Sequence, residues 1–245
     1  MLNNRTGQEI SIGSKRELGP DVQSAQISYR RGQEVIGHVE SGDYWYCVLK
    51  GAVREYAILA EGRRRIVDFL LPGDFFGFPT SHRNFFAADA VSEGTVLARY
   101  PRRSLEQAAD ANPQISTQLR EIAFEALWRS QVRLLILGRV TANAKVSSFL
   151  IEMAERSFDA RDQTVLLPMS RYDIADYLAI SVETVSRALT VLDQCGAIRF
   201  ADRHRLQILD SELLETGFDH PGAVNEPLIQ RRLQQTREKK IVTSR

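Results

Sequence analysis

Residues 170–195 read SRYDIADYLAISVETVSRALTVLDQC, and this segment is the most informative part of the chain. It begins with the hydroxyl of Ser170 and, three residues later, the carboxylate of Asp173, which is the sequence pattern of a helix capping box. Apolar residues then recur at helical spacing on both sides of a short connection. We therefore expect two helices, Ser170–Leu178 and Val182–Cys195, that cross steeply as a helix-turn-helix because only three residues join them.

The second of these helices has one face that a small core does not need. The residues expected to be buried are Val182, Val185, Leu189 and Leu192. The opposite face carries Glu183, Ser186, Arg187 and Thr190. Such side chains suit base edges in the major groove of DNA, where a guanidinium pairs with guanine and a carboxylate accepts from cytosine. A solvated face with one ion pair between Glu183 and Arg187 is the alternative.

The flanking segments favour DNA binding. Upstream, Val146, Phe149, Leu150 and Met153 repeat at helical spacing, and Asp159 to Gln163 reads as a polar loop. Downstream, the alternating stretches Ala197–Ala201 and Arg205–Leu209 are expected to form a β-hairpin. Three helices followed by a hairpin is the order of a winged helix-turn-helix. The expected wing is basic, which suits DNA phosphates, through Arg199, Arg203, His204 and Arg205.

The chain from residue 27 to residue 100 is expected to be β-structure. Turn sequences interrupt short apolar runs at close intervals. Three of the runs are rich in β-branched and aromatic residues: Tyr44–Leu49, Ala52–Leu59 and Arg65–Leu70. This spacing is typical of a sandwich or barrel of antiparallel strands.

A long helix is expected after this β-region. Ser104 to Ala111 is consistent with one short helix, and Asn112-Pro113 is a suitable start for another that runs without glycine or proline to Leu137. Its apolar side chains lie on more than one side, namely Ile115, Leu119, Ile122, Phe124, Ala126, Leu127, Trp128, Leu134 and Leu135. The apolar sides of such a helix need two partners to cover them. One is its own β-domain, and the other is either the same helix of a second subunit or a further part of its own chain.

The chain is therefore predicted to be an α+β protein. It has an N-terminal double-stranded β-helix (jelly-roll or β-roll) sensor domain, a long dimerisation helix and a C-terminal winged helix-turn-helix. The expected segments are an N-terminal extension 1–24, the β-roll 25–112, the dimerisation helix 113–138, the winged helix-turn-helix 139–215 and a mobile basic tail 216–245.

Composition agrees with this organisation. The chain has 245 residues, 43% of them hydrophobic, which is enough for one large core or two ordinary ones. A formal net charge of +1 argues against a wholly basic DNA-packaging protein, although a local basic face is enough to bind phosphates. The first residues form no signal peptide or membrane span, and we expect a cytoplasmic protein.

Several motifs resemble those of one family. Tyr29-Arg30-Arg31-Gly32, Ser41-Gly42-Asp43 and Gly73-Asp74-Phe75-Phe76-Gly77 resemble the β-roll of the cyclic AMP receptor protein and FNR superfamily. Ser181-Val182-Glu183-Thr184-Val185-Ser186-Arg187 resembles the recognition helix of its FNR and FixK branches, and its E-x-x-S-R pattern is the specific element. The similarity covers about residues 20 to 210, nearly all of the expected folded part.

The resemblance implies a homodimeric transcription regulator, more often an activator that contacts RNA polymerase. It implies that Glu183, Ser186 and Arg187 read bases in a palindrome resembling TTGAT-N4-ATCAA. It also implies that Ser170, Arg171 and Ser181 contact phosphates, and we add Thr184, Arg203 and Arg205 as expected contacts to the DNA backbone. Two-fold symmetry would place the two recognition helices about 34 Å apart, one turn of DNA.

The resemblance leaves the signal open. Cyclic-nucleotide binders of the family carry a Gly-Glu pair and an Arg-Ser or Arg-Thr pair, whereas this chain has Gly77-Phe78 and Arg83-Asn84-Phe85-Phe86. We therefore expect function without cyclic nucleotide, although Arg83 remains a candidate for the phosphate. The iron–sulfur cluster of FNR is excluded because no cysteine precedes Cys47. An effector-dependent sensor on the same scaffold, which responds to a cyclic nucleotide, to haem or a gas, or to thiol redox state, is the alternative.

No metal or cofactor is expected. The two cysteines, Cys47 and Cys195, are too few for a disulfide framework. Cys195 is expected to be the more exposed of the two and is a candidate redox site, whereas Cys47 is expected to be a buried, inert thiol. His38 and His82 are candidate haem ligands, but a lone histidine is more often structural. A cupin-type metal enzyme needs two or three histidines and a carboxylate in the β-domain, so we expect no enzyme.

Overall fold

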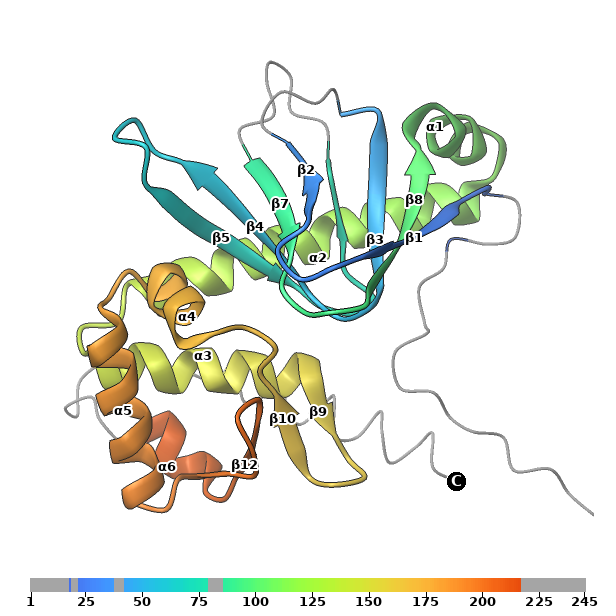
Figure 1. Cartoon of the computed structure of the whole chain (residues 1–245). Coiled ribbons are helices and arrows are strands. Elements are labelled where there is room, and N and C mark those ends of the chain that lie inside the picture. The colour runs from blue at the N-terminus through green and yellow to red at the C-terminus, as the bar shows by residue number, and fades with distance from the viewer. Residues whose placement is uncertain (1–17, 19–21, 38–41, 79–85, 217–245) are drawn as a thin grey trace, which may run out of the picture. The chain divides into compact units, whose positions relative to one another are not determined.

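The computed structural model describes residue 18 and residues 22–37, 42–78 and 86–216 (Figure 1). They form two compact units. The first comprises the described parts of residues 1–137 together with residues 167–182, and the second comprises residues 138–166 and the described part of residues 183–245. The predicted N-terminal extension is largely, and the predicted basic tail almost entirely, outside the described residues, as are His38, His82 and Arg83.

The first unit is built on two four-stranded antiparallel sheets (Figure 1). One sheet has the order β1 (Ala25–Tyr29), β8 (Thr95–Pro101), β3 (Tyr44–Lys50) and β6 (Phe75–Phe76). The other has the order β2 (Glu34–Ile36), β7 (Phe86–Ala90), β4 (Val53–Ile58) and β5 (Arg64–Leu70). Side chains from both sheets form one buried cluster that includes Tyr46, Val48, Val53, Leu70 and Leu97. The predicted β-roll is confirmed.

Two helices follow the β-roll, as predicted. Helix α1 spans Arg102–Ala111 and helix α2 spans Pro113–Leu137. The side chain of Asn112 accepts a hydrogen bond from the backbone N–H of Gln114 at 2.9 Å, which satisfies one of the open donors at the start of α2. A second buried cluster joins both helices to the first sheet and includes Leu18 and Val22 from the predicted N-terminal extension, with Cys47, Phe75, Tyr100, Leu105, Ile115 and Ile122.

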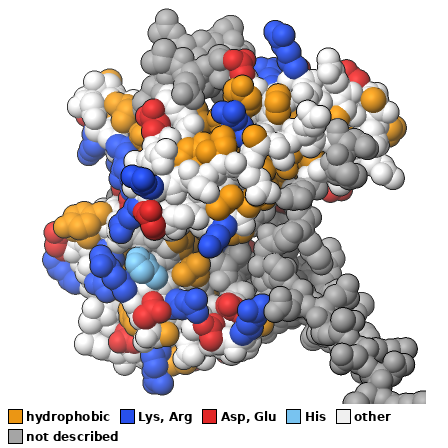
Figure 2. Space-filling view, turned by 45° about the vertical axis from the view of Figure 1, so that its right-hand side comes forward, with side chains coloured by type: hydrophobic (Ala, Val, Ile, Leu, Met, Phe, Trp, Pro, Cys, Tyr) orange, Lys and Arg blue, Asp and Glu red, His pale blue; other side chains and the backbone are white. Residues whose placement is uncertain are grey.

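Helix α2 has a buried face and an exposed apolar face. Arg129 forms ion pairs with Asp68 at 3.1 Å and with Asp74 at 3.2 Å, which hold the helix on the β-roll. Large hydrophobic side chains on its other side remain exposed: Phe124, Leu127, Leu134 and Leu135. On the face drawn in Figure 2, solvent-exposed hydrophobic side chains lie among charged ones. The two-sided apolar pattern predicted for this helix is therefore present.

The second unit contains helices and a small antiparallel sheet. Its helices are α3 (Ala142–Ser157), α5 (Val182–Gln194) and α6 (Ser211–Thr216). Its strands have the order β11 (Ile198–Phe200), β12 (Arg205–Ile208), β10 (Thr164–Leu166) and β9 (Phe158–Asp159). The predicted wing hairpin is β11–β12. Strands β9 and β10 were not predicted, and Asp159 lies in a strand rather than in the expected loop, because two or three residues are too few to show periodicity. Helix α6, six residues long, was not predicted either.

Helix α4 (Arg171–Leu178) belongs to the first unit by its contacts. Ser170 is its N-cap, and the predicted capping box is present because Ser170 and Asp173 bond reciprocally. Ala179 ends the helix in the left-handed conformation, with φ of 54°, and its N–H bonds back to the last turn. None of the helices in the described parts of the chain is long and apolar enough to cross a bilayer.

Candidate nucleic-acid interface

Helix α5 separates its buried and exposed residues as the sequence predicts, except that Val182, which was expected to be buried, is half-buried at the first position of the helix. Its buried side chains are Val185, Ala188, Leu189 and Leu192. Glu183, Arg187 and Thr190 are exposed, and Ser186 is half-buried beside them. The hydroxyl of Thr190 donates to the backbone carbonyl of Ser186 at 2.9 Å, so it is partly satisfied by the helix itself. The three predicted base-reading residues thus share one face of one rigid helix.

The predicted backbone contacts next to this face lie at the start of α5. Ser181 is exposed and directly precedes the helix, and Thr184 is half-buried in its first turn. The N-terminus of a helix is a favourable place for an anion because open N–H groups and the helix dipole both point there. The position of these two residues is therefore compatible with a phosphate contact.

The wing provides further positive charge, but one arginine is already paired. Arg199 and Arg203 are exposed. Arg205 forms a short ion pair with Asp162, which lies in the connection between β9 and β10. Asp162 also accepts hydrogen bonds from the side chain of Thr164, at 2.5 Å, and from its backbone N–H. These bonds with Thr164, and the charge of Arg205, lower the pKa of Asp162, so Asp162 is an ionised competitor for the phosphate expected at Arg205.

At the start of α4 the donors of Ser170 are also occupied. Its backbone N–H and its hydroxyl both donate to Oδ2 of Asp173, at 3.1 Å and 2.6 Å. The hydroxyl in turn accepts from the N–H of Asp173 at 3.2 Å. Arg171, the other phosphate contact predicted on this helix, is exposed. Ser170 therefore acts first as a helix cap, and a phosphate would share its donors with a carboxylate.

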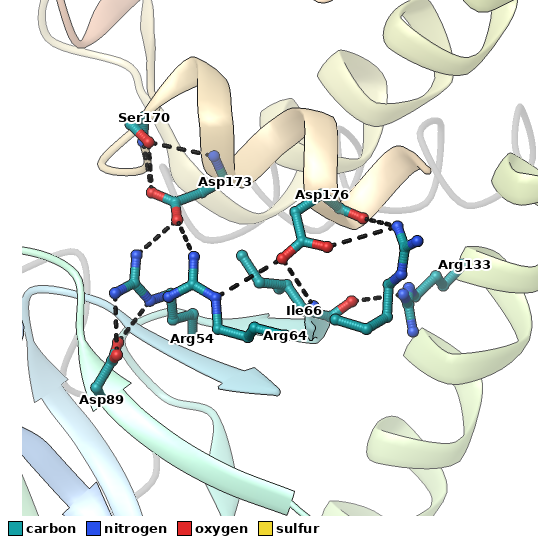
Figure 3. Close-up of polar contacts among 9 residues, drawn as sticks. Arg54, Arg64, Ile66, Asp89, Arg133, Ser170, Asp173 and Asp176 are labelled. Atoms are coloured by element: carbon teal, nitrogen blue, oxygen red, sulfur yellow. Dashed lines mark hydrogen bonds and ion pairs between the residues drawn. The ribbon is translucent and has the colours of Figure 1, made fainter. Parts of the chain in front are cut away.

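The second oxygen of that carboxylate faces two arginines of the β-roll (Figure 3). Oδ1 of Asp173 accepts from Arg54 of β4 at 2.5 Å and from Arg64 of β5 at 3.2 Å. Arg54 also contacts Asp89 of β7, through an ion pair of 2.6 Å and a hydrogen bond of 2.9 Å. Burial alone would raise the pKa of Asp173, but its bonds with Ser170 and the charge of Arg54 lower it, so this carboxylate is ionised.

One turn later, α4 makes a second set of contacts with the β-roll. Asp176 accepts from the backbone N–H of Ile66 at 3.3 Å, and its own carbonyl accepts from Arg65 at 2.7 Å (Figure 3). The ring of Tyr177 packs on Phe69, with 5.1 Å between the centroids. These contacts were not predicted. The signals for them were the run Arg63-Arg64-Arg65 and the polar face that Asp173 and Asp176 give to a helix with buried neighbours.

The part of the β-roll that holds the nucleotide in cyclic-nucleotide binders has an aromatic contact here. Gly77 adopts a φ of 81°, and a Cβ at this position would lie 2.9 Å from the carbonyl oxygen of Tyr44. The ring of the next residue, Phe78, packs edge-on against Trp45, with 4.8 Å between the centroids. Within the described ranges, no group of three or more His, Cys, Asp or Glu side chains is arranged to hold a metal ion.

The two cysteines differ in environment. Cys47 is buried in the β-roll, as expected, and Cys195 is exposed directly after α5. The thiol of Cys195 donates to the carbonyl of Leu192 at 3.4 Å. The exposure of Cys195 agrees with the prediction of an accessible thiol, while a redox role for it stays a prediction.

Comparison with known proteins gives consistent matches. The chain matches the models of the cyclic nucleotide-binding domain over residues 26–112 and of the Crp-like helix-turn-helix domain over residues 144–216. It is 37% identical to the nitrogen fixation regulation protein FixK of Rhizobium meliloti, over 81% of this chain and 91% of the relative. It is 41% identical to the FixK protein of Azorhizobium caulinodans, over 76% of each chain. The solved structure of FixK2 from Bradyrhizobium japonicum matches with a TM-score of 0.74 at 37% identity, over 82% of this chain and 100% of that one.

Proposed function

Because this chain belongs to the CRP/FNR family and is a DNA-binding transcription activator, we propose that it binds a palindrome resembling TTGAT-N4-ATCAA as a homodimer. In this proposal it acts in the cytoplasm, contacts RNA polymerase and needs no cyclic nucleotide. Glu183, Ser186 and Arg187 read bases. The DNA backbone is contacted by Ser170, Arg171, Ser181, Thr184, Arg203 and Arg205.

The exposed face of α5 carries this proposal. A carboxylate, a hydroxyl and a guanidinium stand on one side of a helix whose other side is buried. A helix of this kind fits the major groove, and each well-placed pair with a base contributes about 1–3 kcal/mol of discrimination. The E-x-x-S-R pattern on this face is the one that resembles the FNR and FixK branches.

The exposed side of α2 supports the homodimer. Phe124, Leu127 and Leu134, with Gln131 between them, follow the alternating three- and four-residue spacing of a coiled coil. Phe124 is 61% exposed and Leu134 is 68% exposed, which is unusual for large apolar side chains in one row. A second copy of the same helix would cover this row, and two copies would supply one recognition helix to each half of a palindrome.

Contact with RNA polymerase is proposed from the activator names of relatives. A relative from Rhodopseudomonas palustris, 33% identical over 73% of this chain, is named transcriptional activatory protein AadR. Independence from cyclic nucleotide is proposed because an aromatic side chain, Phe78, stands where such binders carry a glutamate. An ionised glutamate accepts hydrogen bonds from the hydroxyl groups of a ligand, which an aromatic ring does not replace.

A regulator that depends on a small effector is the second candidate. The match to the cyclic nucleotide-binding domain favours it, because this fold holds a ligand in other members. Calorimetric titration of the full chain with cyclic AMP and cyclic GMP separates the two candidates. Heat of binding with a defined stoichiometry supports the second one, and its absence excludes these two nucleotides as the effector.

The central test is DNA binding by the purified, ligand-free chain. Fluorescence anisotropy compares a labelled TTGAT-N4-ATCAA duplex with a scrambled duplex of the same composition, at two salt concentrations. We expect selective binding to the palindrome by roughly a thousandfold, and a selectivity that persists at the higher salt where backbone attraction weakens. Equal binding to the two duplexes at both salt concentrations would contradict the proposal.

A further inference from the structure

The N-terminal end of α4 places a negative charge where DNA is expected to place another. Ser170 and Arg171 are the proposed phosphate contacts of this helix, and Oδ2 of Asp173 lies 2.6 Å from the hydroxyl of Ser170. A phosphate that reaches these residues would therefore stand beside an ionised carboxylate. A phosphate and a carboxylate that share one hydrogen-bond donor repel each other, and the repulsion is stronger where protein rather than water lies between them. The site binds phosphate only if something offsets this charge.

Two arginines of the β-roll are placed to do so. Arg54 and Arg64 both donate to Oδ1 of Asp173, from the side away from Ser170 (Figure 3). The side chain of Asp173 is only 5% exposed, so water screens it little, and the arginines are its main compensation. The whole cluster is balanced, with three guanidinium groups and three carboxylates: Arg54, Arg64 and Arg65 with Asp89, Asp173 and Asp176.

We propose that Arg54 and Arg64 are positioning residues for DNA binding: they hold and neutralise the Asp173 carboxylate so that the start of α4 accepts a DNA phosphate. The inference rests on the proposed function, since it needs Ser170 and Arg171 to meet DNA. Neither arginine touches DNA in this account. Each acts through Asp173, so the β-roll contributes to DNA affinity through strands β4 and β5.

Arg64 is the better residue for a test. Arg54 also neutralises Asp89 inside the β-roll, so its loss would unbalance the sheet itself. Arg64 is 33% exposed, and it contacts Asp173, Asp176 and the ring of Tyr56. The neighbouring Arg63 is a matched control: it is 64% exposed, carries the same charge in the same run, and pairs with Glu61 on the hairpin.

The experiment measures the affinity of full-length variants for the palindrome duplex by fluorescence anisotropy. We expect Arg64→Gln to weaken binding by roughly tenfold at low salt, and Arg63→Gln by less than about twofold. The loss caused by Arg64→Gln should shrink as salt rises, because it comes from an uncompensated charge. Arg64→Lys should restore most of the affinity. Thermal unfolding of each variant shows whether the chain remains folded.

A double-mutant cycle tests the route through Asp173. In an Asp173→Asn background there is no carboxylate to neutralise, so Arg64→Gln should then change the affinity by less than about twofold. This comparison holds even if Asp173→Asn itself loosens the helix cap, because both members of the pair carry that change. A purely structural role of Arg64 would give the same loss in both backgrounds.

The outcomes separate this inference from the proposed function. Failure of the unmodified chain to prefer the palindrome would contradict the proposed function. If the unmodified chain is selective but Arg64→Gln and Arg63→Gln bind alike, the proposed function stands and the inference is wrong. An increase in affinity with Arg64→Gln would also overturn the inference, because the contacts of Arg64 with Asp173 would then hinder DNA binding by α4 instead of favouring it. If Arg64→Gln reduced the affinity equally in the unmodified chain and in the Asp173→Asn variant, the route through this carboxylate would be excluded.

Discussion

Helices α4 and α5 are the two halves of the predicted helix-turn-helix, but they are held in different ways. Helix α5 buries apolar residues and exposes polar ones, as an ordinary amphipathic helix does. Helix α4 also buries apolar side chains, such as Tyr177 against Phe69, but it is held by charges in addition: Asp173 and Asp176 bond to arginines and a backbone amide of the β-roll. One half of the motif is therefore defined by its own sequence, whereas the other depends on residues far along the chain.

The largest expected effect is on the charged half. Arg54→Ala leaves Asp89 and Asp173 without their main partner, while both side chains remain nearly buried. Breaking a buried ion pair on one side typically costs about 3–5 kcal/mol, and we expect the first unit to lose stability by that order. Chemical denaturation measures the loss. The exposed Arg63→Ala is the control and should change the free energy of unfolding by less than about 0.5 kcal/mol.

The next effect is the pH dependence of stability that Glu55 gives to the sheet behind α4. Glu55 lies next to Arg54 on β4, and burial together with the charge of Asp68 raises its pKa to about 7, against an opposing effect of Arg129. A raised pKa means that the folded state prefers the neutral acid. The stability contributed by Glu55 is therefore complete below its ordinary pKa of 4.5 and is lost as the pH rises through 7.

Glu55→Gln should remove this dependence. We expect the variant to be more stable than the unmodified chain by about 2–3 kcal/mol at pH 8, and the difference to shrink towards pH 5. Asp173 has the opposite sign, because its lowered pKa contributes stability that is lost only in acid. Denaturation curves of both proteins between pH 5 and pH 8 provide the measurement. A constant difference over this range would contradict the account of Glu55.

The sequence predicted α5 well and α4 only in part, for a physical reason. The capping box and the apolar spacing are local, so they are visible within a few residues. The partners of Asp173 are Arg54 and Arg64, which precede it by 119 and 109 residues. No periodicity connects positions so far apart, and the arginine run by itself resembles a solvated loop. The β-roll was predictable because its turns recur at close intervals along strands such as β3, β4 and β5.

The DNA-facing side chains of the two helices are tested by replacing one exposed arginine in each. Arg187→Ala should reduce discrimination between the palindrome and a scrambled duplex by about 1–3 kcal/mol, or roughly tenfold to a hundredfold, because a guanidinium that reads a guanine is lost. Arg171→Ala on α4 should weaken binding to both duplexes alike and reduce the salt dependence by about one unit. Anisotropy titrations with the two duplexes measure both. Full discrimination by the Arg187 variant would mean that another face of α5 reads the bases.

The smallest expected effect concerns Asp162, whose negative charge competes with DNA phosphates for Arg205. Asp162 pairs with Arg205 in the wing, as Asp173 pairs with the arginines behind α4, but here the arginine is itself a proposed phosphate contact. Asp162→Asn removes the competitor and leaves Thr164 a polar partner, so we expect affinity for any duplex to rise by only about twofold to threefold, because an exposed ion pair contributes little. Asp202→Asn, at the exposed turn of the same wing, is the control for a general loss of negative charge. Equal gains from the two variants would show that Arg205 is not specifically released. A gain confined to Asp162→Asn, and absent when Arg205 is replaced by alanine, would place this arginine at the phosphate.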